Sequence, residues 1–452
     1  MKNTYIGVLL GLSIVLSSCA DYLGLKPDDS FMVPSTLEDL QGLLDNSDVA
    51  MTFSNSGMGE IASDSYFLRE QSWAAMSDER DRQHYLWLPA SPVGGEWSSP
   101  YRAIMYANTV LTYLPEIDVS ANEQTKANRL KGAALFYRSN KLFNLLQVFA
   151  KPYDPNITNN QLGIPLRVKA TLDEELKRST VEECYAFIIN DLKQAIPLLS
   201  DREEIPTRPS KVSAYAEMAR VYLVMGDHEK AGLYADSALS IHSELLDYEV
   251  DIDLEATVPF DKWTKEVLLD AALRGGSHLS SRAFRVSPFE YNNYEDEDLR
   301  KEAFFSFDDQ GDVQFKGSYN GRNSVSLFMG TTTAEMYLIR AEANARKGLL
   351  DKAAEDLNHL RSKRFRDEDF ITIKFGDQKQ ALEFIKRERR RELIFRGVRW
   401  TDMRRYIILG EFDRSMTRNV DGEEYILTAD DIVNYVFKIP EDVIEYSNLE
   451  QN

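Results

Sequence analysis

The sequence predicts a mainly α-helical protein whose helices are interrupted by two long irregular excursions. Apolar residues recur every three to four positions along much of the chain, which is the period of amphipathic helices. This spacing lapses in the blocks 51–95 and 250–330, where glycines and loop aromatics punctuate the chain. Two helical segments also share one pattern of small residues, as expected for a repeated helix pair.

The helices can be placed in order along the chain. The first follows Ser35 and Thr36, either of which can cap it, and its leucines recur at helical spacing from Leu37 onwards. Further helices are expected at residues 100–114, 123–149, 181–199, 211–224, 229–241, 333–347, 351–364, 379–396 and 400–408. Helical repeats therefore occupy approximately residues 100–245 and 332–410.

Two of these helix pairs, at residues 214–239 and 336–357, look like copies of one unit. Each carries alanines where helices would cross and a glycine, Gly226 or Gly348, where the turn would fall. Alanine lets helix backbones approach each other, and glycine permits the left-handed turn conformation. The pattern is typical of tetratricopeptide-like hairpins, and an ordinary helical hairpin is the alternative.

The N-terminal segment is typical of a bacterial lipoprotein signal peptide. Lys2 precedes an apolar run at residues 5–16, which is shorter than the ~20 residues that span a bilayer. Small residues then lead to Cys19, and this ending resembles a lipobox. We therefore expect a signal peptide at residues 1–18, with a lipidated Cys19 and a polar tether at residues 19–34. An ordinary secretory signal that contains a cysteine is the alternative.

Composition excludes several classes of function. The 452-residue chain carries 53 Lys and Arg against 73 Asp and Glu, a net charge of −20. Such an acidic surface disfavours nucleic acid, and it would be repelled by anionic lipid, so membrane attachment needs a covalent or apolar anchor. Two cysteines and five histidines cannot form a disulfide framework or a Cys/His zinc cluster.

Three motifs suggest chemistry that their context does not support. Gly57 and Gly59 fit part of a dinucleotide fingerprint, but no apolar strand precedes them, so we expect a glycine-bearing surface loop. The acidic run 308–312 lacks the spacing of a calcium loop and is expected to be a solvated turn. The segment 386–405 holds nine basic and three acidic residues at helical spacing, which favours a structural lattice of ion pairs over a nucleic-acid helix.

No catalytic residues, metal ligands or cofactor site are predicted. The chain has no Gly-x-Ser-x-Gly elbow, no His-Glu-x-x-His and no Walker loop. Among 73 carboxylates, an acid pair carries no information without geometry.

A series of segments matches, in order, the motifs of one protein family. The most specific are Trp97, Tyr101 and Ile104 in the segment 97–108, and the helix 335–343. The others are residues 132–149, 163–166, 179–199, 388–405 and 438–440. In this pattern the chain resembles the SusD/RagB family of Bacteroidetes-type outer-membrane lipoproteins. Val398 departs from it, because the family commonly has histidine there.

The resemblance implies both a fold and a role. It implies one SusD-like domain at residues 35–452, with a tetratricopeptide-like scaffold whose loops form the binding surface. It also implies a lipoprotein of the outer membrane that faces the cell surface and acts as the lid of a SusC-like TonB-dependent transporter. No cofactor and no enzymatic activity are implied.

Aromatic residues in the two loop-rich blocks are the candidate ligand contacts. Sugars present C–H groups on one face and hydroxyls at the edge, which suits flat rings with nearby amides and charges. The candidate rings are Trp73, Tyr85, Trp87, Tyr291, Tyr294 and Tyr319, with polar neighbours Arg69, Asn292, Asn293 and Asn320. Packing of these rings under their own loops is the alternative. Trp97, Trp263 and Trp400 are instead expected in the core.

The sequence therefore predicts a non-catalytic, lipid-anchored protein that captures oligosaccharides or polysaccharides and passes them to the transporter. Three alternatives remain at this point. The same scaffold could capture peptides, as RagB-like members do. It could be a secreted hydrolase, or a tetratricopeptide adaptor with no small ligand.

Overall fold

The computed structural model describes residues 33–171, 176–274, 276, 278–280, 283–322, 326–412 and 414–452. The expected signal peptide, Cys19 and nearly all of the tether lie outside these residues. The longer described helices are α2 (Leu37–Leu44), α6 (Gly95–Tyr113), α7 (Gln124–Phe149), α8 (Val181–Ala195), α9 (Lys211–Val224), α10 (His228–Ile241), α13 (Thr333–Arg346), α14 (Leu350–Arg361), α15 (Gln378–Glu392) and α16 (Arg399–Ile408). The mainly α-helical prediction is confirmed.

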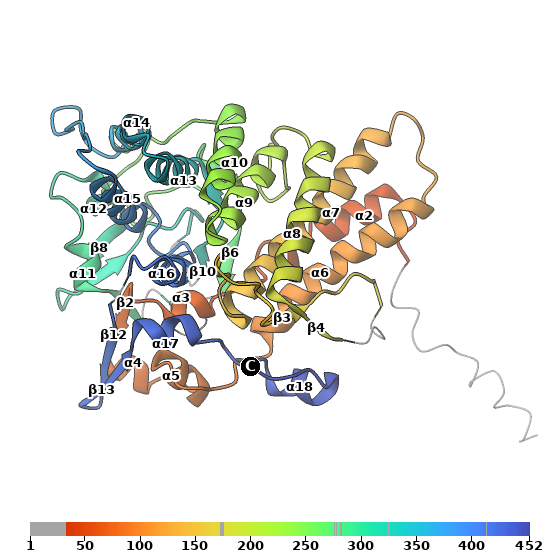
Figure 1. Cartoon of the computed structure of the whole chain (residues 1–452), viewed down its shortest axis with the longest axis horizontal. Coiled ribbons are helices and arrows are strands. Elements are labelled where there is room, and N and C mark those ends of the chain that lie inside the picture. Colours follow the sequence, from red (N-terminus) through yellow and green to blue (C-terminus); the bar gives the residue numbers. More distant parts are fainter. Residues whose placement is uncertain are drawn as a thin grey trace, which may run out of the picture.

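These helices form a continuous scaffold. Figure 1 shows α6 to α10 side by side, with α13, α14 and α15 continuing from α10. Several helices begin with a capping box, in which a hydroxyl and the third residue of the helix exchange hydrogen bonds with each other's backbone. Thr36 caps α2, Thr180 caps α8 and Ser210 caps α9 in this way.

Both predicted helix pairs are present, as α9–α10 and α13–α14. Gly226 and Gly348 lie in the two turns, with φ of +76° and +75°, which glycine adopts without strain. Where α10 crosses α13, a Cβ added at Gly232 would lie 2.5 Å from the Cβ of Ala343. The small residues therefore allow the close helix contact that the sequence predicted.

The two loop-rich blocks contain short helices and strands and pair with each other. The short helices are α3 (Met58–Ala62), α4 (Glu70–Ala74), α5 (Glu79–Tyr85), α11 (Pro288–Tyr291) and α12 (Leu299–Phe304), and the strands are β1 (Asn55–Ser56), β2 (Tyr66–Leu68), β5 (Val267–Leu269), β6 (Ala272–Arg274), β7 (Phe284–Val286), β8 (Phe305–Phe307), β9 (Val313–Phe315) and β10 (Ser326–Phe328). Strand β1 runs parallel to β6, and β10 antiparallel to it. Strand β2 pairs antiparallel with β7, and β8 with β9. Segments more than 200 residues apart thus form one body beside the scaffold.

The remaining elements close the structure. They are β3 (Leu162–Pro165), β4 (Arg178–Thr180), β11 (Thr331–Thr332), β12 (Met416–Val420), β13 (Glu423–Leu427), α17 (Ala429–Asn434) and α18 (Glu441–Ser447), with the π-helix η1 (Ser47–Met51) and the 3-10 turns η2 (Leu114–Glu116) and η3 (Ile196–Leu198). The β12–β13 hairpin was not predicted. Its turn residues Asp421 and Gly422 have positive φ, and an Asp-Gly pair is a strong hairpin signal.

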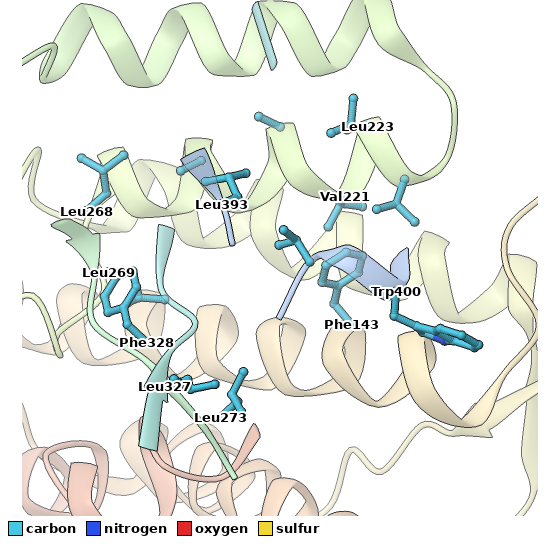
Figure 2. Packing of buried hydrophobic residues seen from close by; sticks show 14 of the residues in the cluster. Phe143, Val221, Leu223, Leu268, Leu269, Leu273, Leu327, Phe328, Leu393 and Trp400 are labelled. Atoms are coloured by element: carbon cyan, nitrogen blue, oxygen red, sulfur yellow. The ribbon is translucent and has the colours of Figure 1, made fainter. Parts of the chain in front are cut away.

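The buried hydrophobic residues form one continuous cluster. Figure 2 shows a part of it in which Phe143 of α7, Val221 of α9 and Trp400 of α16 meet. Trp97 and Trp400 are buried, as predicted. Trp263 is not a core residue, because its side chain is 39% exposed and stacks under Lys262 at the surface.

The glycine motif at residues 57–59 is also placed differently from its prediction. Gly57 is buried and precedes α3, so the segment is not a surface loop. A Cβ at Gly59 would contact the Cβ of Trp400 at 3.4 Å, because α3 packs against α16. The motif therefore serves packing between two helices.

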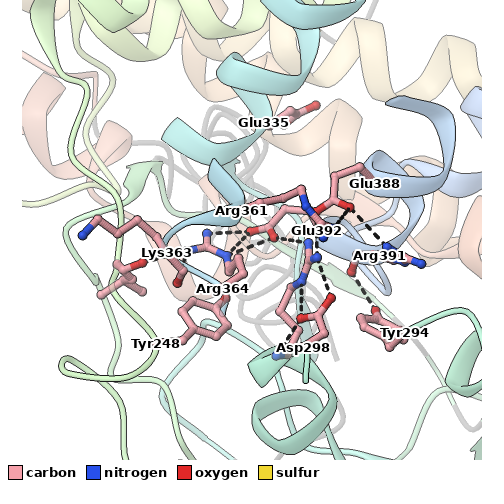
Figure 3. A network of polar contacts seen from close by, with 12 residues as sticks. Tyr248, Tyr294, Asp298, Glu335, Arg361, Lys363, Arg364, Glu388, Arg391 and Glu392 are labelled. Atoms are coloured by element: carbon pink, nitrogen blue, oxygen red, sulfur yellow. Dashed lines mark hydrogen bonds and ion pairs between the residues drawn. The ribbon is translucent and has the colours of Figure 1, made fainter. Parts of the chain in front are cut away.

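The basic segment 386–405 forms the predicted lattice of ion pairs. Figure 3 shows part of it, where Glu392 of α15 accepts a hydrogen bond from Arg364 at 2.7 Å. Glu392 also accepts from Arg300 of α12 at 2.9 Å. Arg389 of α15 donates to Asp402 of α16 at 2.8 Å. These pairs join α12, α15, α16 and the segment that follows α14, so the charges hold helices together.

Candidate functional site

The paired loop blocks present an exposed group of aromatic side chains. We call Tyr291 and Phe307, together with Lys301, the aromatic patch. Phe307 is 59% exposed, whereas Tyr291 and Lys301 are half-buried. Phe289, also in α11, is 50% exposed, but its ring faces Arg390 at 4.6 Å and is not part of the patch. The patch residues come from α11, α12 and β8, which lie on the side of the molecule away from α6 and α7 (Figure 1).

The patch packs directly against a buried ring of the hydrophobic core. The ring of Tyr291 meets Phe305 at 5.6 Å and Phe307 at 5.4 Å, both edge-on. Phe305 and Phe307 are two residues apart in strand β8, so they point to the same side, one buried and one exposed. The ammonium of Lys301 lies 4.8 Å above the ring of Tyr291. Tyr291 therefore connects the buried ring of Phe305 to the exposed ring of Phe307.

Arg69 braces the loop that carries Phe307. Its Nε donates to Asp312 at 2.7 Å and an Nη donates to Asp308 at 2.5 Å. Asp308 also accepts from Arg285 of β7 at 2.8 Å. Desolvation pushes the pKa of Asp308 up, but the hydrogen bonds from Arg285, from two backbone amides and from Arg69 hold it below its usual range. The acidic run 308–312 is thus an ion-paired turn that joins the β8–β9 pair to β7 through Arg285 and to Arg69, which follows β2.

Of the predicted contact residues, Tyr291, Asn292, Arg69 and Trp73 keep part of their side chains accessible. Asn292 is exposed and lies next to the patch at the end of α11. Trp73 lies half-buried on α4, where its indole donates to the carbonyl of Arg82 at 3.1 Å. Arg69 is occupied by its ion pairs, so its role here is to position the loop.

Four predicted rings are buried, which corrects their assignment as surface contacts. The Tyr85 hydroxyl accepts from the amide of Leu68 at 2.9 Å, and the Trp87 indole donates to the carbonyl of Ala62 at 2.9 Å. The other two are Tyr294, which donates to the carbonyl of Arg391 at 2.7 Å, and Tyr319, whose hydroxyl lies 2.6 Å from that of Tyr248. Rings packed on both faces offer a sugar no surface.

The two remaining predicted amides differ. The backbone carbonyl of Asn293 accepts from Arg391 at 2.6 Å, but its side-chain Nδ2 is buried without a hydrogen-bond partner among the described residues. Asn320 donates to the carbonyl of Ser326. The Asn320 side chain also accepts from the amide of Arg322 at 3.0 Å. The Asn320 side chain therefore holds its own loop in place, and the buried Asn293 amide is not available at the surface.

The sequence analysis missed Phe307 and Lys301 of the patch, and it also missed the exposed ring of Phe289. A signal for Phe307 existed, because it directly precedes the acidic turn 308–312 and so could be expected at the end of a strand. Phe289 follows Pro288, which starts α11, and nothing in the local sequence shows that its ring is exposed. Among the described residues, no helix is long and apolar enough to cross a membrane.

Comparison with known families identifies the class of protein to which this helical scaffold belongs. A model described as "Starch-binding associating with outer membrane" matches residues 21–223, and a model of the SusD family matches residues 288–446. The chain belongs to the SusD/RagB family.

Individual relatives are more distant. "SusD-like protein P2" from Formosa agariphila is 28% identical over 140 residues, which is 31% of this chain and 25% of that protein. The match thus spans a quarter of the relative's length. A putative sugar binding protein from Bacteroides vulgatus has a TM-score of 0.75 at 22% identity, over 93% of this chain and 99% of its own. A laminarin binding SusD-like protein has a TM-score of 0.66 at 18% identity, over 91% of this chain and 97% of its own. At these identities the structures establish a shared fold.

Proposed function

We propose that the protein is a non-catalytic lipoprotein that captures oligosaccharides or polysaccharides at the cell surface. It would deliver them to a SusC-like TonB-dependent transporter in the outer membrane. The observation that carries the proposal is the aromatic patch, in which the exposed ring of Phe307 packs against Tyr291 and the ammonium of Lys301 lies above Tyr291. The family's description and the laminarin binding neighbour support a glycan as the ligand.

The chemistry of the patch suits a neutral sugar chain. Ring faces remove the C–H face of a pyranose from water, and Lys301 and Asn292 can donate to its hydroxyls. The contact is open rather than enclosed, so affinity should be modest, with a dissociation constant of about 1 μM to 1 mM. Such affinity fits a protein that must release what it captures.

Replacing Phe307 and Tyr291 together with alanine should weaken glycan binding at least about tenfold, a loss of roughly 1.4 kcal/mol. Calorimetry and native gels containing laminarin, amylopectin or xylan measure the effect. Tyr446→Ala is the matched control, because this ring is 86% exposed on α18, far from the patch in sequence.

Two results would contradict this function. If calorimetry detects binding heat with casein digests and none with glycans, the ligands are peptides and the glycan proposal is wrong. Release of reducing ends from any polymer would show that the protein is a hydrolase.

The lipid anchor has a separate test. Cys19→Ala should move the protein from the membrane fraction to the soluble fraction, because each buried CH₂ of an acyl chain contributes about 0.8 kcal/mol to membrane binding. Labelled palmitate should appear on the wild-type protein and not on the variant. Palmitate on neither protein would contradict the proposed lipid anchor, but it would not affect the proposal for the binding surface.

A further inference from the structure

We propose that a groove between α8 and the α9–α10 turn is a second saccharide-binding site, separate from the aromatic patch. The groove has a volume of about 550 Å³, and Tyr153, Glu182, Asn190, Lys193, Asp227 and Lys230 contribute its polar lining. This inference rests on the proposed glycan function and adds a second point of contact. In Figure 1, α8 and α9 lie within the scaffold, whereas α11 and β8 lie at its other side.

One wall of the groove carries a fixed aromatic ring. Tyr153 packs edge-on against Tyr185 at 5.1 Å and stays half-buried. Its hydroxyl donates to Glu182 at 3.0 Å. Partial burial and the nearby carboxylate raise the pKa of Tyr153 to about 12, so the hydroxyl remains protonated at neutral pH. On α8, Ala186 and Ile189 add apolar surface beside the ring.

Helix α8 also offers the groove two polar side chains that the fold does not use. Asn190 and Lys193 are exposed one turn apart on α8, and neither side chain has a partner among the described residues. Lys230 pairs with Asp227 at 2.6 Å across the first turn of α10. An amide, two ammonium groups and two carboxylates can exchange hydrogen bonds with sugar hydroxyls.

The charges of the groove select a neutral ligand. Lys193 and Lys230 balance Glu182 and Asp227, so an anionic or a cationic ligand gains no net attraction. A volume of about 550 Å³ lies within the ~300–1,000 Å³ of small-molecule sites. An aromatic ring, apolar helix surface and mixed donors and acceptors with no net charge together fit a short stretch of neutral glycan.

A neighbouring groove can be compared with the proposed site. It lies between α10, α13 and α14 and has a volume of about 690 Å³. There Arg340 is held by Asp356 and Asp236, both at 2.6 Å, and the Tyr337 hydroxyl donates to the carbonyl of Ser243 at 3.2 Å. Arg340 and Tyr337 are thus engaged within the fold, unlike Asn190 and Lys193 of the proposed site. This groove therefore supplies a matched control.

The test uses Asn190→Ala/Lys193→Ala, in the wild-type chain and in the Phe307→Ala/Tyr291→Ala background. Neither replaced side chain has a structural partner, so both proteins should fold. The control is Lys352→Ala, an exposed lysine that lines the neighbouring groove. The probes are native gels that contain laminarin, amylopectin or xylan.

We expect the patch variant to keep weak retardation in the gel that retards the wild type, and the groove substitutions to abolish it. In the wild-type background, loss of one of two linked sites should weaken polymer binding at least about tenfold. Lys352→Ala should match its parent. Groove variants that migrate like their parents in both backgrounds, while the wild type is retarded, would overturn the second site and leave the proposed function standing. A wild type retarded by none of the polymers would overturn the proposed function and the groove with it.

Discussion

Replacing Arg300 with alanine should lower the free energy of unfolding by about 3–5 kcal/mol, because it leaves buried carboxylates without their cation. The Arg300 side chain is fully buried and pairs with Asp298 at 2.7 Å, Glu388 at 2.6 Å and Glu392 at 2.9 Å. All three acids are buried as well. Without Arg300, Asp298 has no cation partner left among the described residues, and Glu392 keeps only Arg364 there.

A surface pair provides the control for this substitution. Arg366 lies 3.6 Å from Glu302, and both side chains are substantially exposed to solvent. Exposed pairs contribute about 0–1 kcal/mol, so Arg366→Ala should lower the free energy of unfolding by no more than about 1 kcal/mol. Urea unfolding followed by circular dichroism measures both variants. Equal losses for the two arginines would show that burial does not set the strength of this lattice.

The same lattice predicts how the effect depends on pH. Burial pushes the pKa of Glu388 up, but Arg300, Arg361 and Arg391 lower it from 4.5 to about 2. A carboxyl whose pKa is lowered by folding stabilises the protein above 4.5, and this stabilisation is lost as the pH falls toward 2. Removing Arg300 raises that pKa, so the stability gap between wild type and Arg300→Ala should narrow from pH 7 to pH 3.

The scaffold could be predicted from sequence because its signals are local. The helix at residues 211–224 was placed at its observed bounds, since its apolar period and the cap at Ser210 lie within the segment itself. The ion lattice was also foreseeable, because arginines and glutamates at helical spacing among apolar residues need buried partners. The acids that pair with the arginines could not be predicted, because Asp298 and Glu266 lie in other parts of the chain.

The candidate site could be predicted only in part, because exposure of a loop aromatic depends on distant segments. Tyr85 and Trp87 are covered by Arg418, whose guanidinium lies 4.1 and 4.3 Å from their rings. Arg418 belongs to the β12–β13 hairpin, more than 300 residues further along the chain. Strands of two or three residues, such as β2 and β7, are too short to show an alternating pattern. The pairing that buries one ring and exposes another was therefore hidden from local sequence.

The second large loss of stability is expected when a buried tryptophan is replaced. Trp400→Ala should cost about 3–5 kcal/mol, the usual range for truncating a buried aromatic side chain. Its indole is 1% exposed and lies edge-on to Tyr435 at 6.0 Å, with α3 against its other side at Gly59. The cavity would open where α3, α16 and the segment after α17 meet, so these elements cannot close it without moving together.

Trp263→Ala is the matched comparison, because the same number of atoms is removed from a site that is 39% exposed. This indole donates to Asp270 at 2.7 Å and stacks with Lys262 at 4.5 Å, contacts that together contribute about 1–2 kcal/mol. Thermal unfolding should therefore lower the melting temperature much more for Trp400→Ala than for Trp263→Ala. Similar shifts would mean that α3 and α16 repack around the missing ring, and that the buried glycine motif at residues 57–59 does not depend on Trp400.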